Sequence, residues 1–344
     1  MGMEDLYREV MKLNMMDDND LKRDTARAFF EKLNYMKLPE YFNWASEIFE
    51  GLHVKERGDK TALVWVDIAT GENASFSYRD FAFRGNQCLN RLRKAGVNKG
   101  DNMYMMVPIY PETWFASFAC IKGGLVAVPT ATTMTQRELE FRFEAYPPDV
   151  IIADAIYTSI IDAALATVKM TPKIKLVLGK KEGWVEYTEL ASEPTEAEAA
   201  KTKSSDLLFC FFTSGTTGLP KRVGHTATSY PVGHLSTSVM TGIRTDDIHH
   251  NLSAPGWAKW AWSSFFAPLN VGATGSGFHF TVLDGDKYLT ALTTHKLSVF
   301  CAPPTAWRMF INLDTSKYDF SSLRQSIGAG EPLNPEVIEQ VQKA

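Results

Sequence analysis

The sequence has few cysteines and no long apolar run, and each absence excludes a class of protein. Zinc sites and secreted disulfide frameworks need closely spaced or numerous cysteines. The four cysteines here stand singly in apolar surroundings without a CxxC pair, and we expect reduced core thiols: Cys88, Cys120, Cys210 and Cys301. No stretch approaches the roughly 18 apolar residues of a membrane span. The first thirty residues also lack the apolar segment of a signal peptide.

The chain also lacks a strong excess of either charge. Lysine and arginine together number 36 against 40 acidic residues, a net charge of -4, and no long basic block is present. Nucleic-acid binding depends on basic groups that neutralise rows of phosphates, so we do not expect it. These features favour a cytoplasmic protein without a membrane span. They leave peripheral membrane association and homo-oligomer formation open.

The length and the apolar content predict a large core. A chain of 344 residues that is 45% apolar can form one large domain or two moderate ones. Short apolar runs alternate with helical patterns from residue 62 onward, which predicts an α/β fold of layered parallel-sheet sub-domains with flanking helices. The apolar runs are ALVWVDI, NMYMMVPI, LVAVP, DVIIAD, KLVLG, LLFCFF and LSVFC.

Composition suggests boundaries along the chain. We predict an N-terminal helical cap over 1–60, a first α/β sub-domain over 61–195 and a second, incomplete one over 206–344. The polar, charge-mixed stretch 192–206 is interpreted as a linker. The last helix starts with Asn334 as cap and Pro335 at its first position. It has no glycine cap, so we expect the chain to stop inside a domain.

The stretch FFTSGTTGLPK, residues 211–221, combines hydroxyls, glycines and a lysine behind an apolar strand. A nucleophile elbow would need glycine where Phe212 stands. A Walker A loop needs a different glycine spacing. Converging amides, hydroxyls and one ammonium can instead bind a polyphosphate and a hydrated magnesium ion. The alternative is a solvated surface loop. The residues concerned are Thr213, Ser214, Gly215, Thr216, Thr217, Gly218, Pro220 and Lys221.

SGTTGLPK resembles the phosphate-binding signature of the adenylate-forming superfamily, which contains acyl-CoA synthetases, luciferases and peptide-synthetase adenylation domains. Four further stretches are similar to the medium-chain acyl-CoA synthetases and occur in their order. They are PEYFNWASEIFEG, GWAKWAWSSFFAPL, VFCAPPTAWRM and GAGEPLNPE. The resemblance covers the chain from about residue 38 to the end.

This resemblance implies an ATP-dependent ligase of a medium-chain, branched or aromatic acid with CoA, acting through an acyl-adenylate. ATP, Mg²⁺ and CoA are the implied cofactor and co-substrates, and small-molecule carboxylates are the implied partners. Lys221 and Thr216 are the implied catalytic residues, acting by positioning and charge stabilisation because neither half-reaction needs an enzyme nucleophile. The phosphate loop binds the nucleotide together with Gly330, Glu331 and Pro332. Trp257 and Thr133 are the implied acyl-side contacts.

The sequence also departs from the family. The Tyr-Gly-x-Thr-Glu motif, the ribose-binding aspartate, the hinge and the C-terminal lid domain with its lysine are absent. We therefore expect this chain alone to be inactive or weakly active. An adenylation domain that loads a carrier protein and a non-catalytic nucleotide-binding module stay open as alternatives. His249 and His250 are expected on the surface, and His225 is expected to be structural.

Overall fold

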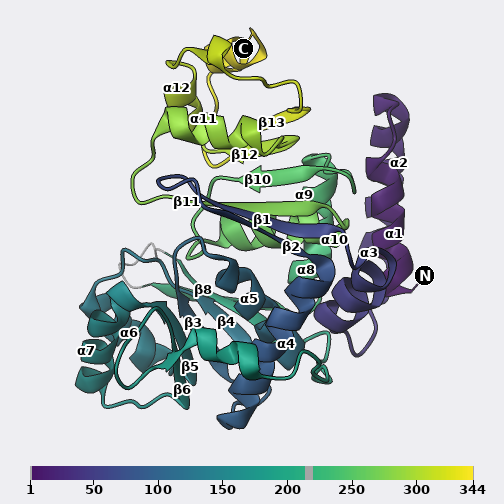
Figure 1. Ribbon diagram of the computed structural model, residues 1–344. Helices are drawn as coiled ribbons and strands as arrows, with labels where there is room; N and C mark the ends of the chain where they lie inside the picture. Colours follow the sequence, from purple (N-terminus) through teal and green to yellow (C-terminus); the bar gives the residue numbers. More distant parts are fainter. Residues whose placement is uncertain (1, 214–219, 344) are drawn as a thin grey trace.

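The computed structural model describes residues 2–213 and 220–343, which form two mixed β-sheets separated and flanked by helices (Figure 1). The six-stranded sheet has the order β13-β12-β10-β11-β1-β2, with bounds Gln325–Gly328, Val299–Ala302, Ile248–Asn251, Thr274–His279, Thr61–Asp67 and Asn73–Ser77. The seven-stranded sheet has the order β7-β6-β5-β3-β4-β8-β9, with bounds Val185–Glu186, Ile174–Leu178, Val150–Asp154, Asn102–Met106, Val126–Pro129, Leu207–Thr213 and Lys221–Thr226.

Both sheets are parallel except at one edge. β2 runs antiparallel to β1, and β9 runs antiparallel to β8. The other pairs are parallel, as the alternation of apolar runs and helices predicts. The predicted α/β class with flanking helices is therefore confirmed.

The two sheets exchange strands across the predicted sub-domain boundary. β1 lies before residue 195 but pairs with β11 of the six-stranded sheet, with Leu63 opposite Gly275. β8 lies after residue 206 but pairs with β4 of the seven-stranded sheet. The predicted units 61–195 and 206–344 therefore do not coincide with the sheets, because this pairing joins segments that are far apart in the sequence.

The helices form layers on both faces of each sheet. Between the sheets lie α4 (Tyr78–Lys94), α5 (Pro111–Gly123) and the π-helices η1 (Ala45–Val54) and η4 (Trp260–Phe266), which share one apolar core with both sheets. α6 (Gln136–Ala145) and α7 (Thr158–Val168) cover the outer face of the seven-stranded sheet. α11 (Gly285–Thr294), α12 (Pro304–Phe310) and α13 (Pro335–Lys343) cover the outer face of the six-stranded sheet. α13 begins at Pro335, as predicted.

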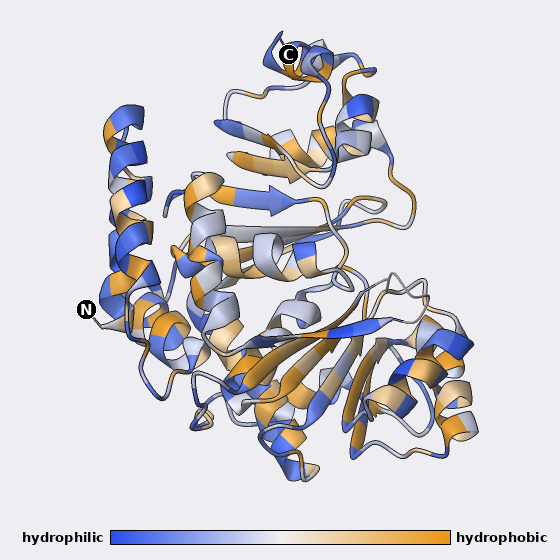
Figure 2. Ribbon diagram, turned by 180° about the vertical axis from the view of Figure 1, so that it is seen from behind, coloured by the Kyte–Doolittle hydropathy of each residue, from blue (hydrophilic) through white to orange (hydrophobic). Residues whose placement is uncertain are grey.

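Alternate strand residues face different cores, because successive side chains of a strand point to opposite faces. In β3, Met103 and Met105 enter the central core, whereas Tyr104 and Met106 enter the outer one. Figure 2 shows several strands of the seven-stranded sheet largely in the orange of hydrophobic residues. Burial on both faces explains the continuous apolar runs in the sequence.

The N-terminal region contains α1 (Met3–Asn14), α2 (Asn19–Asn34) and the short α3 (Lys55–Arg57). α1 is anchored by Asn14, whose amide donates to the carbonyls of Ser238 and Ile243 at 3.0 and 2.7 Å. α2 extends along one side of the molecule (Figure 1). Short helices elsewhere are α8 (Ser229–Gly233), α9 (Leu235–Met240), α10 (Ala267–Asn270), η2 (Ala155–Tyr157), η3 (Tyr187–Ser192) and η5 (Thr315–Lys317).

The predicted linker is held along α4. Asn86 donates to the carbonyl of Thr195, and Asn90 donates to the carbonyls of Pro194 and Glu196, at 2.8 to 2.9 Å. Amide side chains one turn apart on the helix therefore satisfy successive carbonyls of an extended segment. Residues 194–196 of this stretch therefore dock against a helix through their backbone.

The four cysteines are free and buried, as expected for core thiols: Cys88, Cys120, Cys210 and Cys301. Within the described part of the chain, no helix combines the length and the apolar character needed to cross a membrane.

Candidate functional site

The carboxyl ends of the parallel strands in the two sheets meet. Tyr110, shortly after β3, stacks on His279 at the end of β11, with ring centroids 4.6 Å apart. Trp65 of β1 donates its indole N–H to the carbonyl of Ile109 at 2.7 Å. Ligands of open parallel sheets bind outside these carboxyl ends. The ends of β4, β8, β10 and β13 therefore delimit the candidate site, and every predicted site residue in the described part of the chain lies at or near one of them.

The predicted phosphate loop connects β8 to β9. Thr213 ends β8 and pairs with Lys221 at the start of β9, with the threonine hydroxyl 3.4 Å from the lysine carbonyl. Both residues are exposed, and Pro220 is half-buried. The predicted residues Ser214, Gly215, Thr216, Thr217 and Gly218 lie outside the described residues. The described stem thus places the lysine and one threonine hydroxyl together at the base of the loop.

Aromatic side chains of β8 and β9 pack against α8. Phe209 and Phe211 of β8 pack against Tyr230 of α8, with ring centroids 4.9 and 5.8 Å apart. His225 of β9 packs on the same tyrosine at 4.6 Å, and burial lowers its pKa. The Tyr230 hydroxyl donates to the carbonyl of Ala258 at 3.2 Å. The base of the phosphate loop is thereby tied to the segment after β10.

The two predicted acyl-side segments touch through their backbones. Gly256 lies so close to Thr130 and Ala131, at the end of β4, that an added Cβ would be 2.4 Å from the Ala131 Cα. Thr133 is exposed in the turn that follows, and Trp257 is 61% exposed. The structure therefore brings the segments of Thr133 and Trp257 together, with both side chains open to solvent.

We expect Gly256→Ala to lower the free energy of unfolding by about 1 to 3 kcal/mol, because the methyl group would overlap the backbone of Thr130 and Ala131. Urea denaturation measures the change. Gly233→Ala is the matched control, since Gly233 lies in α8 with nothing within 4 Å of the added Cβ. That substitution should leave stability unchanged or raise it slightly. Equal effects of the two substitutions would contradict the close approach at Gly256.

The predicted nucleotide turn follows β13. Gly330 has a φ of +115°, a conformation that glycine adopts without strain, and nothing lies within 4 Å of an added Cβ. Glu331 is 3.9 Å from the guanidinium of Arg308 on α12. The ammonium of Lys259, just before η4, donates to the carbonyl of Ala329 at 3.1 Å. The acyl-side segment and the nucleotide turn are therefore joined directly.

The prediction that His249 and His250 are surface residues is wrong, since each is 1% exposed on β10. His250 faces the outer core, where its ring nitrogens contact the hydroxyls of Ser276 and Tyr288. His249 faces η4, with Nε2 3.3 Å from the Ser263 hydroxyl. The reason is that β10 is a central strand with helices on both faces, so even its polar residues are buried.

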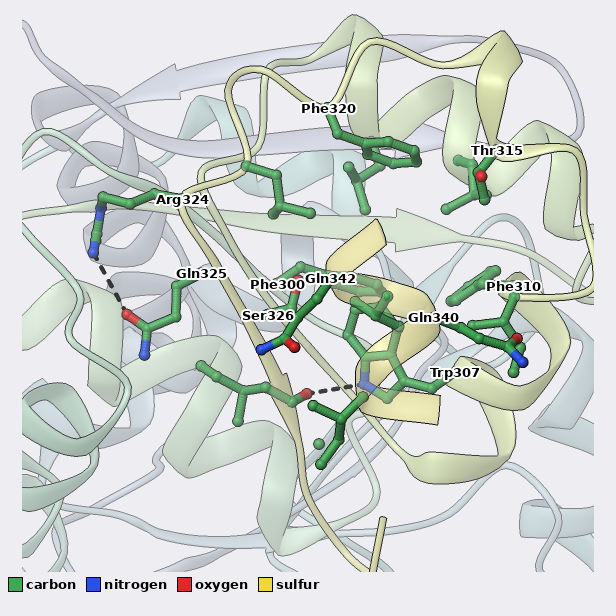
Figure 3. Close-up of a pocket in the computed structure, with 18 of the residues that line it drawn as sticks. Phe300, Trp307, Phe310, Thr315, Phe320, Arg324, Gln325, Ser326, Gln340 and Gln342 are labelled. Carbon is green, nitrogen blue, oxygen red and sulfur yellow. Dashed lines mark hydrogen bonds between the residues drawn. The ribbon is translucent and has the colours of Figure 1, made fainter. Parts of the chain in front are cut away.

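A cavity of about 690 Å³ lies on the outer face of the six-stranded sheet, between β13, α12 and α13. Figure 3 shows Gln340 and Gln342 of α13 beside Trp307, whose indole N–H donates to the carbonyl of Ile327 at 3.1 Å. None of the predicted site residues lines it. Within residues 2–213 and 220–343, no group of three or more His, Cys, Asp or Glu side chains could hold a metal ion.

Comparison with known proteins identifies the family. Residues 52–344 match the family model of the AMP-binding enzymes, which is most of the chain. The chain belongs to this family. The similarity includes the β8–β9 hairpin, the segment after β10 and the turn after β13, so the predicted relationship to the adenylate-forming superfamily is confirmed.

Named relatives are acyl-CoA ligases. The chain is 49% identical over 298 residues to 4-hydroxybutyrate--CoA ligase 1 of Metallosphaera sedula, covering 86% of this chain and 52% of the relative. It is 31% identical over 345 residues to the mitochondrial acyl-coenzyme A synthetase ACSM3 of Mus musculus, covering 98% of this chain and 58% of the relative. The chain therefore spans little more than half the length of these relatives.

A solved structure has the same fold. The anthranilate CoA ligase AuaEII in complex with anthranoyl-AMP superposes with a TM-score of 0.82 at 26% identity, over 90% of this chain and 60% of that one. The described residues thus have the fold of the N-terminal domain of adenylate-forming enzymes, as the sequence predicted.

Proposed function

We propose that this chain is the N-terminal portion of an ATP-dependent carboxylic acid–CoA ligase that works through an acyl-adenylate. One observation carries the proposal: three segments meet at the carboxyl edges of the two sheets. They are the stem of the phosphate loop, the acyl-side segment and the nucleotide turn, joined through Tyr230, Gly256 and Lys259. A nucleotide and an acid bound along these segments would lie side by side.

The chemistry requires positioning and charge stabilisation. The substrate carboxylate attacks the α-phosphorus of ATP, pyrophosphate leaves, and the CoA thiol then attacks the carbonyl of the acyl-adenylate. Lys221 can stabilise the charge that develops on the departing pyrophosphate. Mg²⁺ would enter with ATP, because it retains waters and binds largely through substrate phosphates. Gly330, Glu331 and Pro332 would line the adenosine side.

Two similarities bear on the identity of the acid. The sequence resemblance favours medium-chain, branched or aromatic acids. The named relative at 49% identity favours a short acid with a terminal hydroxyl group, and we propose 4-hydroxybutyrate or an acid of similar size as the preferred substrate. A cytoplasmic location is part of the same proposal. Because the relatives are almost twice as long, we expect residues 1–344 alone to adenylate slowly or not at all.

Carboxylate-dependent ATP–pyrophosphate exchange tests the proposal, using the protein at the length that its gene encodes. The panel runs from acetate to dodecanoate and includes hydroxylated, branched and aromatic acids. We expect exchange with a subset of short or hydroxylated acids, followed by acyl-CoA formation when CoA is added. Exchange without transfer to CoA would favour an adenylation domain that loads a carrier protein. Folded, ATP-binding protein that exchanges with no acid would favour a non-catalytic module.

A further inference from the structure

A buried polar layer lies between β10 and η4, directly behind the acyl-side segment. His249 and Asn251 are two residues apart on β10, so both side chains point to the η4 face. The amide nitrogen of Asn251 donates to the Ser264 hydroxyl at 3.0 Å. The preceding residue of η4, Ser263, contacts His249 through its hydroxyl. Two neighbouring serines of η4 therefore face two residues of β10. All four side chains are at most 2% exposed.

Three polar atoms of this layer lack a hydrogen-bond partner within the described part of the chain. They are Nδ1 of His249, Oδ1 of Asn251 and Nε1 of Trp260. Trp260 is 2% exposed, so none of these atoms reaches bulk water. Leaving one buried polar atom unpaired costs about 1 to 3 kcal/mol. A bound polar group that paired with these three atoms would remove this cost.

The three atoms are connected through contacts of the same layer. Trp260 packs edge-on against Trp114 of α5, with ring centroids 4.9 Å apart. The Trp114 indole N–H is 3.3 Å from the carbonyl of Ser264, and Ser264 is the partner of Asn251. The residues that carry the unpaired atoms thus belong to one packed layer.

The hydrogen-bonding character of these atoms selects a ligand group. The Trp260 indole only donates, and the Asn251 oxygen only accepts. Burial lowers the pKa of His249 to about 3, so at neutral pH its ring is uncharged and offers one donor and one acceptor. A hydroxyl group can accept from Trp260 and donate to Asn251 at once. A methyl group pairs with neither, and a carboxylate cannot donate to the asparagine oxygen.

The layer is continuous with the acyl-side segment. Asn251 is the last residue of β10, and residues 252–259 lead from it to η4. The backbone N–H of Trp260 donates to the carbonyl of Trp257 at 3.0 Å, so one turn separates the two indoles. Trp257 is 61% exposed, whereas Trp260 is buried. This segment therefore connects the exposed indole to the buried polar layer.

We propose that Asn251, Trp260 and His249 form the closed end of the acyl pocket and recognise a hydroxyl group at the far end of the substrate. These three would be specificity-determining residues, and the proposal rests on the proposed acid–CoA ligase function. The ligand class is a short carboxylic acid with a terminal hydroxyl. The apolar isostere, with a methyl in place of the hydroxyl, would leave the three atoms unpaired and bind less well.

The test compares 4-hydroxybutanoate with pentanoate, which differ by this exchange of hydroxyl for methyl. We measure kcat/KM for adenylation of each acid by the wild type and by Asn251→Leu and Trp260→Phe, using the protein at its gene-encoded length. The wild type should prefer 4-hydroxybutanoate by at least about 10-fold, and each variant should lower this ratio by about 10-fold or more. The ratio of two acids in one preparation does not depend on how much of the protein is folded.

Asn270→Leu is the matched control. Asn270 is a fully buried asparagine whose amide is paired with the Trp44 indole and the carbonyl of Pro231, at 2.8 and 2.9 Å. The same substitution there should leave the ratio unchanged. Trp260→Phe keeps an aromatic ring and removes only the indole N–H. If Asn251→Leu does not fold, the ratio of kcat/KM for the two acids can still be measured with Trp260→Phe.

The outcomes separate the two proposals. A ratio that is unchanged in Asn251→Leu or Trp260→Phe, or that falls equally in Asn270→Leu, would overturn the hydroxyl site and leave the ligase function standing. A wild type that prefers pentanoate would also overturn the site. Absence of adenylation with every acid would instead overturn the proposed function, and this inference with it.

Discussion

Replacement of Lys221 by alanine is expected to lower the rate of ATP–pyrophosphate exchange by about 10²- to 10³-fold, the loss typical for one preorganised charge-stabilising donor. Lys221 lies at the start of β9 opposite Thr213, and it forms no salt bridge with the described residues. Its ammonium is therefore available to a ligand. Because the lysine is exposed, its removal should not change the urea midpoint.

The reason for a large effect is that the interaction strengthens along the reaction. Negative charge accumulates on the pyrophosphate as its bond to the α-phosphorus breaks, so the loss should appear mainly in kcat. Lys221→Arg retains the charge and should recover part of the rate. Lys32→Ala is the control for loss of one positive charge, since Lys32 is exposed on α2 and pairs with Glu9. An exchange rate that stays at the wild-type value in Lys221→Ala would remove this lysine from the site.

The places of the proposed site segments in the fold could be predicted from the sequence because local signals mark the ends of strands. The run LLFCFF predicts β8, and Asn334-Pro335 predicts the start of α13, since caps and apolar periods act over a few residues. The predicted site segments follow β4, β8, β10 and β13 for the same reason. Parallel sheets gather such segments at one edge, which general topology predicts without coordinates.

The assignment of strands to sheets could not be predicted in this way. β1 joins β11, and β8 joins β4, through backbone hydrogen bonds between distant segments whose side-chain patterns resemble those of any buried strand. The docking of residues 194–196 on α4 could not be predicted for a related reason. The polar residues of 192–206 are typical of a linker, and the partners of this stretch are amide side chains on a helix about 100 residues earlier.

The polar residues of β10 show a further limit of sequence analysis. A pair of adjacent histidines favours a surface position when composition alone is considered. Here His249 and His250 lie on a central strand between two helical layers. The signal that could have identified them is their position before the GWAKWAW segment, which follows the carboxyl end of a strand. The roles of Trp257, Thr133, Gly330, Glu331 and Pro332 in binding stay predictions.

We expect the protein to lose stability between pH 7 and pH 5, which is a higher pH than that of ordinary acid denaturation. Burial lowers the pKa of all seven histidines in the folded protein, and most for four of them: His53, His249 and His250 to about 3, and His234 to about 4. For His53 the positive charge of Arg57 adds to the effect, and for His234 that of His225 does. Their unfolded pKa is about 6.5. The unfolded chain therefore binds protons below pH 6.5 that the folded protein does not.

Because the unfolded chain binds more protons, the free energy of unfolding decreases as the pH falls. The stabilisation is fully present above pH 6.5 and is lost as the pH falls toward 4, at about 1.4 kcal/mol per pH unit for each histidine. Burial raises the pKa of Glu47 and Glu112, which offsets part of the loss because the folded protein then takes up protons first. We expect the free energy of unfolding to fall by about 4 to 8 kcal/mol between pH 7 and pH 5.

Urea denaturation at intervals between pH 7.5 and pH 5 measures this loss, and one substitution isolates a single histidine. His53 is buried, with Nε2 3.2 Å from the carbonyl of Asn270. His53→Gln supplies an amide nitrogen that can donate to the same carbonyl but does not titrate. We expect the slope of unfolding free energy against pH to decrease by about one proton in this variant, or about 1.4 kcal/mol per pH unit. A wild-type stability independent of pH from 7 to 5 would mean that these histidines are charged in the folded protein, and parallel slopes for wild type and His53→Gln would contradict the burial of a neutral His53.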